Sequence, residues 1–206
     1  FVGRMRIRRS VVRGFGAKAA AGYVPKATRE SASPFFLDYP ESGVEPVRLL
    51  RLVEHLGAPQ TGPELEFPLT EDDERELNAS GLNAGLVPGE YICVHPGARI
   101  RDKCWPPWRF AEVADRLADE FGVAVVLTGS AKEADLAAAV ADNMRNTPID
   151  AAAPISIGAM AVLMNGARLL ICNDTGVSHM AAGLKLPSVV IFSKADIHRW
   201  SPLDQE

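Results

Sequence analysis

Several motifs that identify common nucleotide-dependent enzymes are absent from this 206-residue sequence. No G-x-G-x-x-G follows the first predicted strand of the regular half of the chain, which argues against a dinucleotide-dependent oxidoreductase, and the P-loop pattern G-x-x-x-x-G-K-[ST] is missing. The G-x-S-x-G elbow of α/β-hydrolases is also absent. No Asp-x-Asp pair is present to bridge a metal ion to a diphosphate. A bound diphosphate would therefore be held by cationic side chains and a helix terminus, and we expect neither a metal site nor a cofactor.

Cysteine and long apolar runs are scarce. Cys93, Cys104 and Cys172 are odd in number and form no C-x-x-C pair, and two of them lie in strand-like apolar runs. We therefore expect reduced thiols in a cytoplasmic protein rather than disulfides or a metal site. No apolar run approaches the roughly 18 residues that a membrane-spanning helix needs, so no such helix is predicted.

Net positive charge is also lacking. The formal net charge of -4 and pI near 5.6 argue against a general nucleic-acid-binding protein. The charge is uneven, because residues 1–18 contain no acid and six cations: Arg4, Arg6, Arg8, Arg9, Arg13 and Lys18. Such a run is usually a solvated face; the alternative is peripheral contact with an anionic membrane surface or with an anionic substrate.

The chain is globular in composition, with 47% hydrophobic and 23% charged residues, and is long enough for about one and a half domains. It begins at Phe1 rather than Met, and we expect it to be a fragment. Residues 1–46 are interrupted by many Gly and Pro residues and do not resemble a self-sufficient domain. Helices are predicted over 47–56 and from Thr70, where acids in the first turn suit the helix dipole, to Gly81. Pro and Gly residues place the junction between 58 and 90, so we assign 1–80 to a partial N-terminal domain with its linker and 81–206 to a second domain, truncated at its C-terminal end.

From residue 91 onward, strands and helices alternate. Apolar runs predict strands at 91–95, 123–127, 149, 167–172 and 188–192, and helices are predicted near 108–121, 131–143, 156–165 and after residue 176. This alternation predicts an α/β fold, a Rossmann-like parallel sheet with helices on both faces. Ligands of such sheets bind outside the carboxyl ends of the strands.

The turn after the fourth strand is the most informative of these ends. Asp174 suits the N-cap of the following helix, and Gly176 permits close approach to the backbone. The free N–H groups of roughly 175–178, together with the helix dipole, suit a phosphate or diphosphate. The same residues would also suit a capped turn that binds no ligand. His179, near the helix N-terminus, should resist protonation.

Two other strand ends carry polar residues. The loop after the first strand contains Arg99, Arg101 and Lys103, which could neutralise a diphosphate. After the second strand, Ser130 and Glu133 have the spacing of a capping box, which would explain them without a ligand.

Five motifs in order resemble glycosyltransferase family 9, the heptosyltransferases, over residues 91–203: His95-Pro96-Gly97-Ala98, Lys103-x-Trp105-Pro106-x-x-Arg109-Phe110-Ala111, Thr128-Gly129-x-x-x-Glu133, Asn173-Asp174-Thr175-Gly176-x-Ser178-His179-x-Ala181-Ala182 and Arg199-Trp200-x-Pro202. The resemblance implies the nucleotide-sugar half of a two-domain GT-B enzyme, preceded by the end of its acceptor-side domain. It implies inverting, metal-independent transfer of heptose from ADP-heptose to the lipopolysaccharide inner core.

The same resemblance implies roles for individual residues. Lys103 and Asp174 are the expected catalytic residues, with Lys103 at the diphosphate and Asp174 at the donor-sugar hydroxyls. Glu133 would bind the ribose and Thr175 and Gly176 the phosphates, with Val177 and His179 also in the donor site. The family's general base lies near the start of the first domain, so we expect this fragment alone to be inactive. A nucleotide-sugar-binding module without turnover, or a GT-B transferase or epimerase that uses a UDP-sugar, remains the alternative.

Overall fold

The computed structural model describes residues 14–16, 18–25 and 34–203, and the chain divides into two units, Phe1–Pro63 and Glu64–Glu206. Apart from Lys18, the basic run near the N-terminus lies outside the described residues. The division lies within the predicted junction of 58–90, but before the boundary proposed at residue 80. No helix in the described part of the chain is long and apolar enough to span a membrane.

The first unit contains two short parallel strands and a helix. β1 (Gly22–Val24) pairs with β2 (Phe36–Asp38), and α2 (Glu45–His55) corresponds to the helix predicted at 47–56. The Tyr23 hydroxyl donates a hydrogen bond to the carbonyl of Arg48 on α2. The buried Arg48 guanidinium in turn donates to the Gly43 carbonyl at 2.6 Å, so this cation is satisfied inside the unit.

The second unit is built on a five-stranded parallel sheet in the order β5-β4-β3-β6-β7. The strands are β3 (Tyr91–His95), β4 (Ala124–Thr128), β5 (Ile149–Ala151), β6 (Leu169–Asn173) and β7 (Ser188–Ile191). Val94 of the central strand lies opposite Leu127 on one side and Ile171 on the other, so the carboxyl ends of β3, β4 and β6 meet at one edge. The predicted α/β fold with a parallel sheet is confirmed.

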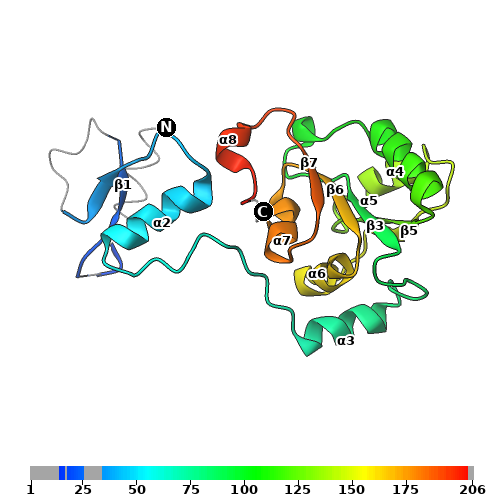
Figure 1. Ribbon diagram of the computed structural model, residues 1–206, viewed down its shortest axis with the longest axis horizontal. Coiled ribbons are helices and arrows are strands. Elements are labelled where there is room, and N and C mark those ends of the chain that lie inside the picture. The colour runs from blue at the N-terminus through cyan, green and yellow to red at the C-terminus, as the bar shows by residue number, and fades with distance from the viewer. Residues whose placement is uncertain (1–13, 17, 26–33, 204–206) are drawn as a thin grey trace. The chain divides into compact units, whose positions relative to one another are not determined.

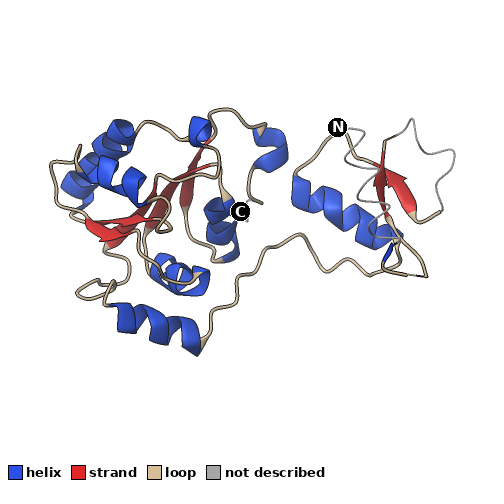
Figure 2. Cartoon of the chain, turned by 180° about the vertical axis from the view of Figure 1, so that it is seen from behind, coloured by secondary structure: helices blue, strands red, loops and turns tan. Residues whose placement is uncertain are grey.

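Helices cover both faces of this sheet (Figures 1 and 2). Ile92 and Val94 pack with α4 (Pro107–Phe121) and α5 (Ala134–Ala141), whereas Cys93 packs with α6 (Ile157–Asn165) and α7 (Gly176–Gly183). Successive strand residues point to opposite faces, which explains this division. The short elements η2 (Arg101–Lys103) and α8 (Ile197–Trp200) lie in loops. Cys93, Cys104 and Cys172 are free thiols.

Helix α3 (Glu71–Ser80) belongs to the second unit. The Thr70 hydroxyl accepts the Asp73 N–H, and the Asp73 carboxylate accepts the Thr70 N–H at 2.9 Å, a capping box that confirms the structural role predicted for these acids. Gly81, in the left-handed conformation with φ 72, ends the helix. Glu76 accepts the N–H of Ser156 at 2.7 Å, which ties α3 to the start of α6. This contact explains why the unit begins before residue 80.

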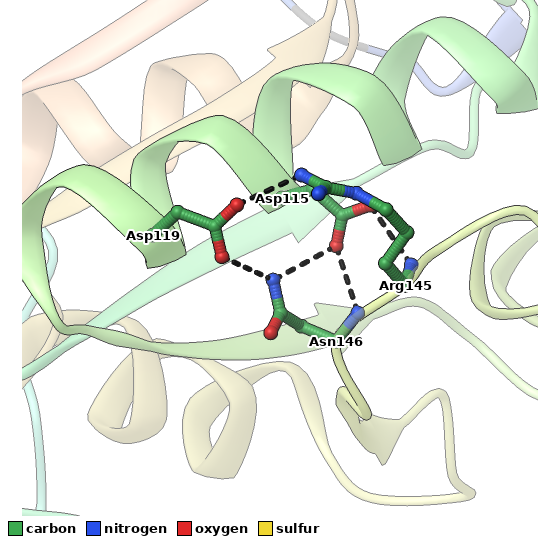
Figure 3. Close-up of polar contacts among 4 residues, drawn as sticks. All are labelled: Asp115, Asp119, Arg145 and Asn146. Carbon is green, nitrogen blue, oxygen red and sulfur yellow. Dashed lines mark hydrogen bonds and ion pairs between the residues drawn. The ribbon is translucent and has the colours of Figure 1, made fainter.

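A carboxylate pair fixes the segment before β5 to α4 (Figure 3). Asp115, 3% exposed, accepts the backbone N–H groups of Arg145 at 2.8 Å and Asn146 at 3.0 Å. Asp119 accepts the Arg145 guanidinium at 2.8 Å and the Asn146 side-chain amide at 2.9 Å. Burial raises the pKa of Asp115, but the hydrogen bonds from Arg145 and Asn146 outweigh it and hold the pKa below its usual value.

Candidate functional site: a donor pocket at the carboxyl edge of the sheet

The turn from β6 into α7 exposes backbone donors at the carboxyl edge of the sheet. Asp174 directly follows β6, and its N–H donates to the Ile191 carbonyl of β7 at 3.1 Å, which continues the pairing of the two strands. Thr175 therefore occupies the N-cap, without a side-chain capping bond, and the prediction of Asp174 as N-cap is wrong by one residue. Ser178 donates its N–H to the Thr175 carbonyl at 3.0 Å, so it is not a free donor. Within the described residues, the N–H groups of Thr175, Gly176 and Val177 have no acceptor.

Glu133 is held on its own loop after β4. Its Oε2 accepts the Ser130 N–H at 3.0 Å and the Ser130 hydroxyl at 2.6 Å. The predicted capping box is only half formed: Glu133 itself is the N-cap of α5, which begins at Ala134 rather than near 131. Oε1 of Glu133 lies against Gly97, where an added Cβ would be only 2.2 Å from it. Gly97 thus leaves the space that this carboxylate fills.

The titration of His95 and Glu133 is set by burial and by their mutual proximity. Burial lowers the pKa of His95, and the nearby Glu133 carboxylate partly opposes this effect. Burial raises the pKa of Glu133, but hydrogen bonds from Ser130 and the charges of His95 and Arg101 bring it below the usual value. Near pH 7 the pair therefore consists of a neutral imidazole and a carboxylate.

A cavity of about 520 Å³ brings these groups together. Glu133 and His95 lie on one part of its wall, and the start of α7 forms another. The apolar part of the wall comes from three stretches of the chain, 65–67, 155–160 and 177–180: Leu65, Phe67, Ile155, Ile157, Met160, Val177 and Met180. An apolar chamber with a few converging polar groups is typical of a small-molecule site.

A second cavity, of about 340 Å³, shares Thr175, Gly176 and His179 with the first. Asp174 and Arg99 lie in its wall, but not in that of the larger cavity. The start of α7 therefore borders two chambers, one with the Glu133 carboxylate and one with the Asp174 carboxylate.

The cationic loop after β3 is only partly available to a ligand. Arg101 forms two hydrogen bonds with Asp135 of α5, at 2.7 and 3.0 Å, so it is already paired. Arg99 lines the smaller cavity. Lys103 belongs to η2, but its side chain lies outside the described part of the structure.

The remaining predicted residue, His179, borders both cavities. Burial lowers its pKa and the nearby Asp174 partly opposes this, so the expected resistance to protonation results mainly from burial. In the described part of the chain, no group of three or more His, Cys, Asp or Glu side chains could hold a metal ion.

The structure adds residues for which no individual role was predicted. Asn173 is fully buried; its amide donates to the Pro96 carbonyl at 2.8 Å and its Oδ1 accepts the Trp105 N–H at 2.9 Å, which fixes the loop between them. The available signals were its position at a strand end, beside Asp174, and its place in the fourth family motif. Leu65 and Phe67 reach the larger cavity from a segment without periodicity, and no sequence pattern would have identified them.

Comparison with known proteins agrees with this architecture. The chain is 31% identical over 162 residues to lipopolysaccharide heptosyltransferase 3 of Escherichia coli strain K12. The aligned region covers 75% of this chain and 45% of that relative. A crystal structure of a family 9 glycosyltransferase from Veillonella parvula superposes with a TM-score of 0.74 at 22% identity, covering 88% of this chain and 54% of that one. E. coli heptosyltransferase WaaC with ADP superposes with a TM-score of 0.60 at 22% identity, covering 81% and 50%.

These solved structures support the predicted GT-B-type fold class. The chain spans less than half of the length of the two heptosyltransferase 3 relatives that it matches, 37% of one and 45% of the other. Residues 7–206 match the family described as glycosyltransferase family 9 (heptosyltransferase). A family match over nearly all of the sequence decides the assignment: the chain belongs to glycosyltransferase family 9, the heptosyltransferases.

Proposed function

We propose that the second unit binds ADP-heptose and that the whole protein transfers heptose from it to the lipopolysaccharide inner core. Membership of the heptosyltransferase family supports the reaction class. The observation that carries the choice of donor site is the shared border of the two cavities, where the exposed N–H groups of α7 separate a chamber with Glu133 from a chamber with Asp174.

A nucleoside diphosphate sugar matches this division. We assign the adenosine to the larger cavity, whose 520 Å³ is within the range of about 300–1,000 Å³ typical of small-molecule sites. Its ribose would donate to Glu133. The diphosphate would lie against Thr175, Gly176 and Val177, since free N–H groups and the helix dipole favour anions. The heptose would then occupy the smaller cavity, with its hydroxyls donating to Asp174.

The proposed reaction is inverting and needs no metal ion. An acceptor hydroxyl attacks the anomeric carbon of the heptose, and the bond from that carbon to the ADP oxygen breaks. The leaving diphosphate gains negative charge in the transition state, so preorganised N–H donors and the cation of Lys103 accelerate the step by stabilising that charge.

We assign acceptor binding and the general base to the acceptor-side domain, of which residues 1–80 would be the end. These 206 residues alone should then bind nucleotide without transferring heptose. The lipopolysaccharide acceptor would bring the protein to the inner face of the inner membrane as a peripheral, cytoplasmic enzyme. Measurable heptose transfer by this chain alone would contradict the assignment of the base.

Calorimetric titration of ADP, UDP and NAD into the purified chain tests the donor assignment. We expect ADP to bind most tightly. Binding of UDP alone would contradict the heptose proposal and favour a UDP-sugar transferase or epimerase. If the folded chain bound no nucleotide, the donor site would be refuted. ADP binding combined with an inactive whole protein would favour a binding module without turnover.

A further inference from the structure

His95 is a buried histidine with one ring nitrogen bonded inside the protein. It ends β3, is 3% exposed and lines the larger cavity. Its Nδ1 lies 3.1 Å from Thr128 Oγ1 on the neighbouring strand. No described residue bonds to its Nε2. In the described part of the chain His95 has no fully enclosed nitrogen without a partner, so Nε2 opens onto the cavity that the ring lines, where a ligand can bond to it.

The contacts of Thr128 indicate which nitrogen of His95 carries the hydrogen. The Thr128 hydroxyl lies 3.1 Å from Nδ1 and 3.5 Å from the Val94 carbonyl oxygen. Because a carbonyl can only accept, both contacts are hydrogen bonds only if the hydroxyl donates to Val94 and accepts Nδ1–H; we assign this tautomer, which leaves a lone pair on Nε2. Burial lowers the pKa of His95 despite the nearby Glu133, so the ring is neutral near pH 7. His95 therefore presents an acceptor to the cavity, not a cation.

Glu133 supplies a second acceptor in the same wall. Ser130 occupies only Oε2, with its N–H and its hydroxyl. Oε1 lies beside Gly97 and receives no hydrogen bond from the described residues. Glu133 and His95 line the same cavity, and Oε1 of Glu133 lies against Gly97, only two residues after His95. The cavity thus offers two neighbouring acceptors and, at these positions, no donor.

We propose that His95 is a second nucleoside-binding residue, with Nε2 accepting a hydrogen bond from one ribose hydroxyl while Glu133 accepts from the other. A ribose 2′,3′-diol presents two adjacent donors, which is the pattern that complements two neighbouring acceptors. The inference rests on the proposed function, which assigns a nucleotide to this cavity, and adds a specificity-determining residue to it. It also explains why the loop needs Gly97, since a larger residue would displace one of the two acceptors.

Titration of ADP, 2′-deoxy-ADP and 3′-deoxy-ADP into the 206-residue chain tests the pairing. In the wild type, loss of the hydroxyl that His95 binds should weaken binding about three- to tenfold, the usual effect of one neutral hydrogen bond. Loss of the hydroxyl that Glu133 binds should weaken it about ten- to a hundredfold, because that contact is charge-assisted. His95→Phe keeps a planar ring but no nitrogen. This variant should lose the penalty for one deoxynucleotide and retain the penalty for the other. Glu133→Gln should weaken the opposite discrimination. His198→Phe, a matched histidine change on α8 that lines neither cavity, should preserve both penalties.

Several outcomes would overturn the pairing. Equal weakening of all three nucleotides by His95→Phe would indicate a packing role, and unchanged binding would exclude contact. If Glu133→Gln removed both penalties, Glu133 would hold both hydroxyls; this comparison needs no His95 variant. Should His95→Phe not fold, His95→Gln replaces it, because its side-chain oxygen can lie near the Nε2 position and should retain the wild-type discrimination. A wild-type chain that binds no ADP refutes the proposed function as well, whereas ADP binding without either penalty refutes only this inference.

Discussion

Gly97→Ala is the substitution that most directly tests the role of Glu133. The added Cβ would lie 2.2 Å from Glu133 Oε1 and 2.5 Å from its Cδ, whereas ordinary contact begins at 3.4 Å. The carboxylate must therefore move by about 1 Å, a displacement large enough to impair a positioned polar contact. The backbone of Gly97 is not in the left-handed region, so alanine introduces no backbone strain there.

The expected effect is a loss of binding without a large loss of stability. Displacement weakens the contacts of Ser130 with Glu133, but replacing glycine by alanine at a permitted conformation stabilises by about 0.4–1 kcal/mol through the unfolded state. These effects largely cancel, so the melting temperature should change little. Loss of a charge-assisted contact to the ribose costs about 1.5–3 kcal/mol, which is about ten- to a hundredfold in the Kd for ADP.

Gly129→Ala is the matched control in the same cavity. Its Cβ would meet Ala152 Cβ at 3.4 Å and Glu133 Cβ at 3.5 Å, which is ordinary contact. Calorimetry with ADP should therefore give nearly wild-type affinity for this variant. Wild-type affinity in Gly97→Ala would refute the assignment of Glu133 in its observed position. Equal losses in both variants would show that the cavity tolerates no added methyl group, whatever Glu133 does.

Three further predictions concern catalysis, strain and acid stability. In the whole protein, Asp174→Asn and Lys103→Ala should each lower kcat/KM about ten- to a hundredfold. The melting temperature of Asp174→Asn should not change, because Thr175 rather than Asp174 is the N-cap of α7. A fall in melting temperature with full activity would contradict the donor role. Lys185, directly after α7, has φ 57, a conformation that favours glycine. Lys185→Gly should therefore raise the free energy of unfolding, measured in urea, by about 1 kcal/mol. A lower free energy of unfolding in this variant would show that contacts of the lysine side chain outweigh its backbone strain. The pKa of Asp115 is lowered in the folded state, so the stability that its carboxylate contributes is complete above the unfolded pKa of about 4 and is lost as pH falls through the folded pKa. Asp115→Asn should therefore lower the free energy of unfolding by about 1.5–3 kcal/mol at pH 7 and by less at pH 3. Equal losses at both pH values would contradict this linkage.

The strands of the second unit were predictable because both faces of the parallel sheet are covered. Strands buried on both faces are continuous apolar runs, such as the one that ends at Leu127, and these runs stand out from the amphipathic helices between them. The turn after β6 was recognisable for the same reason, since an apolar strand there leads directly into a helix. The family resemblance came from short motifs at these strand ends, where loops are constrained by the groups they hold.

Features that depend on long-range pairing were not predictable. The helix start moved from Asp174 to Thr175 because β7, which follows α7 in the chain, extends its pairing with β6 by one more hydrogen bond. Arg101 is paired because Asp135 happens to face it from α5, and no local pattern links the two. Strand order likewise depends on which apolar runs pack together, and not on the sequence of any one run.

Asn173 and Asp174 illustrate why neighbouring residues of similar shape are not interchangeable at this edge. The buried Asn173 donates to the Pro96 carbonyl and accepts the Trp105 N–H at the same time, which an amide can do and a carboxylate cannot. A carboxylate there would face the Pro96 carbonyl without a hydrogen to donate, and burying it would carry a desolvation penalty. Asp174, one residue on, lines the smaller cavity, where a charged acceptor can meet hydroxyl groups. The order Asn-Asp therefore assigns the neutral amide to the interior, where it holds the loop that carries Arg99 and Lys103, and the carboxylate to the ligand side of the same strand end.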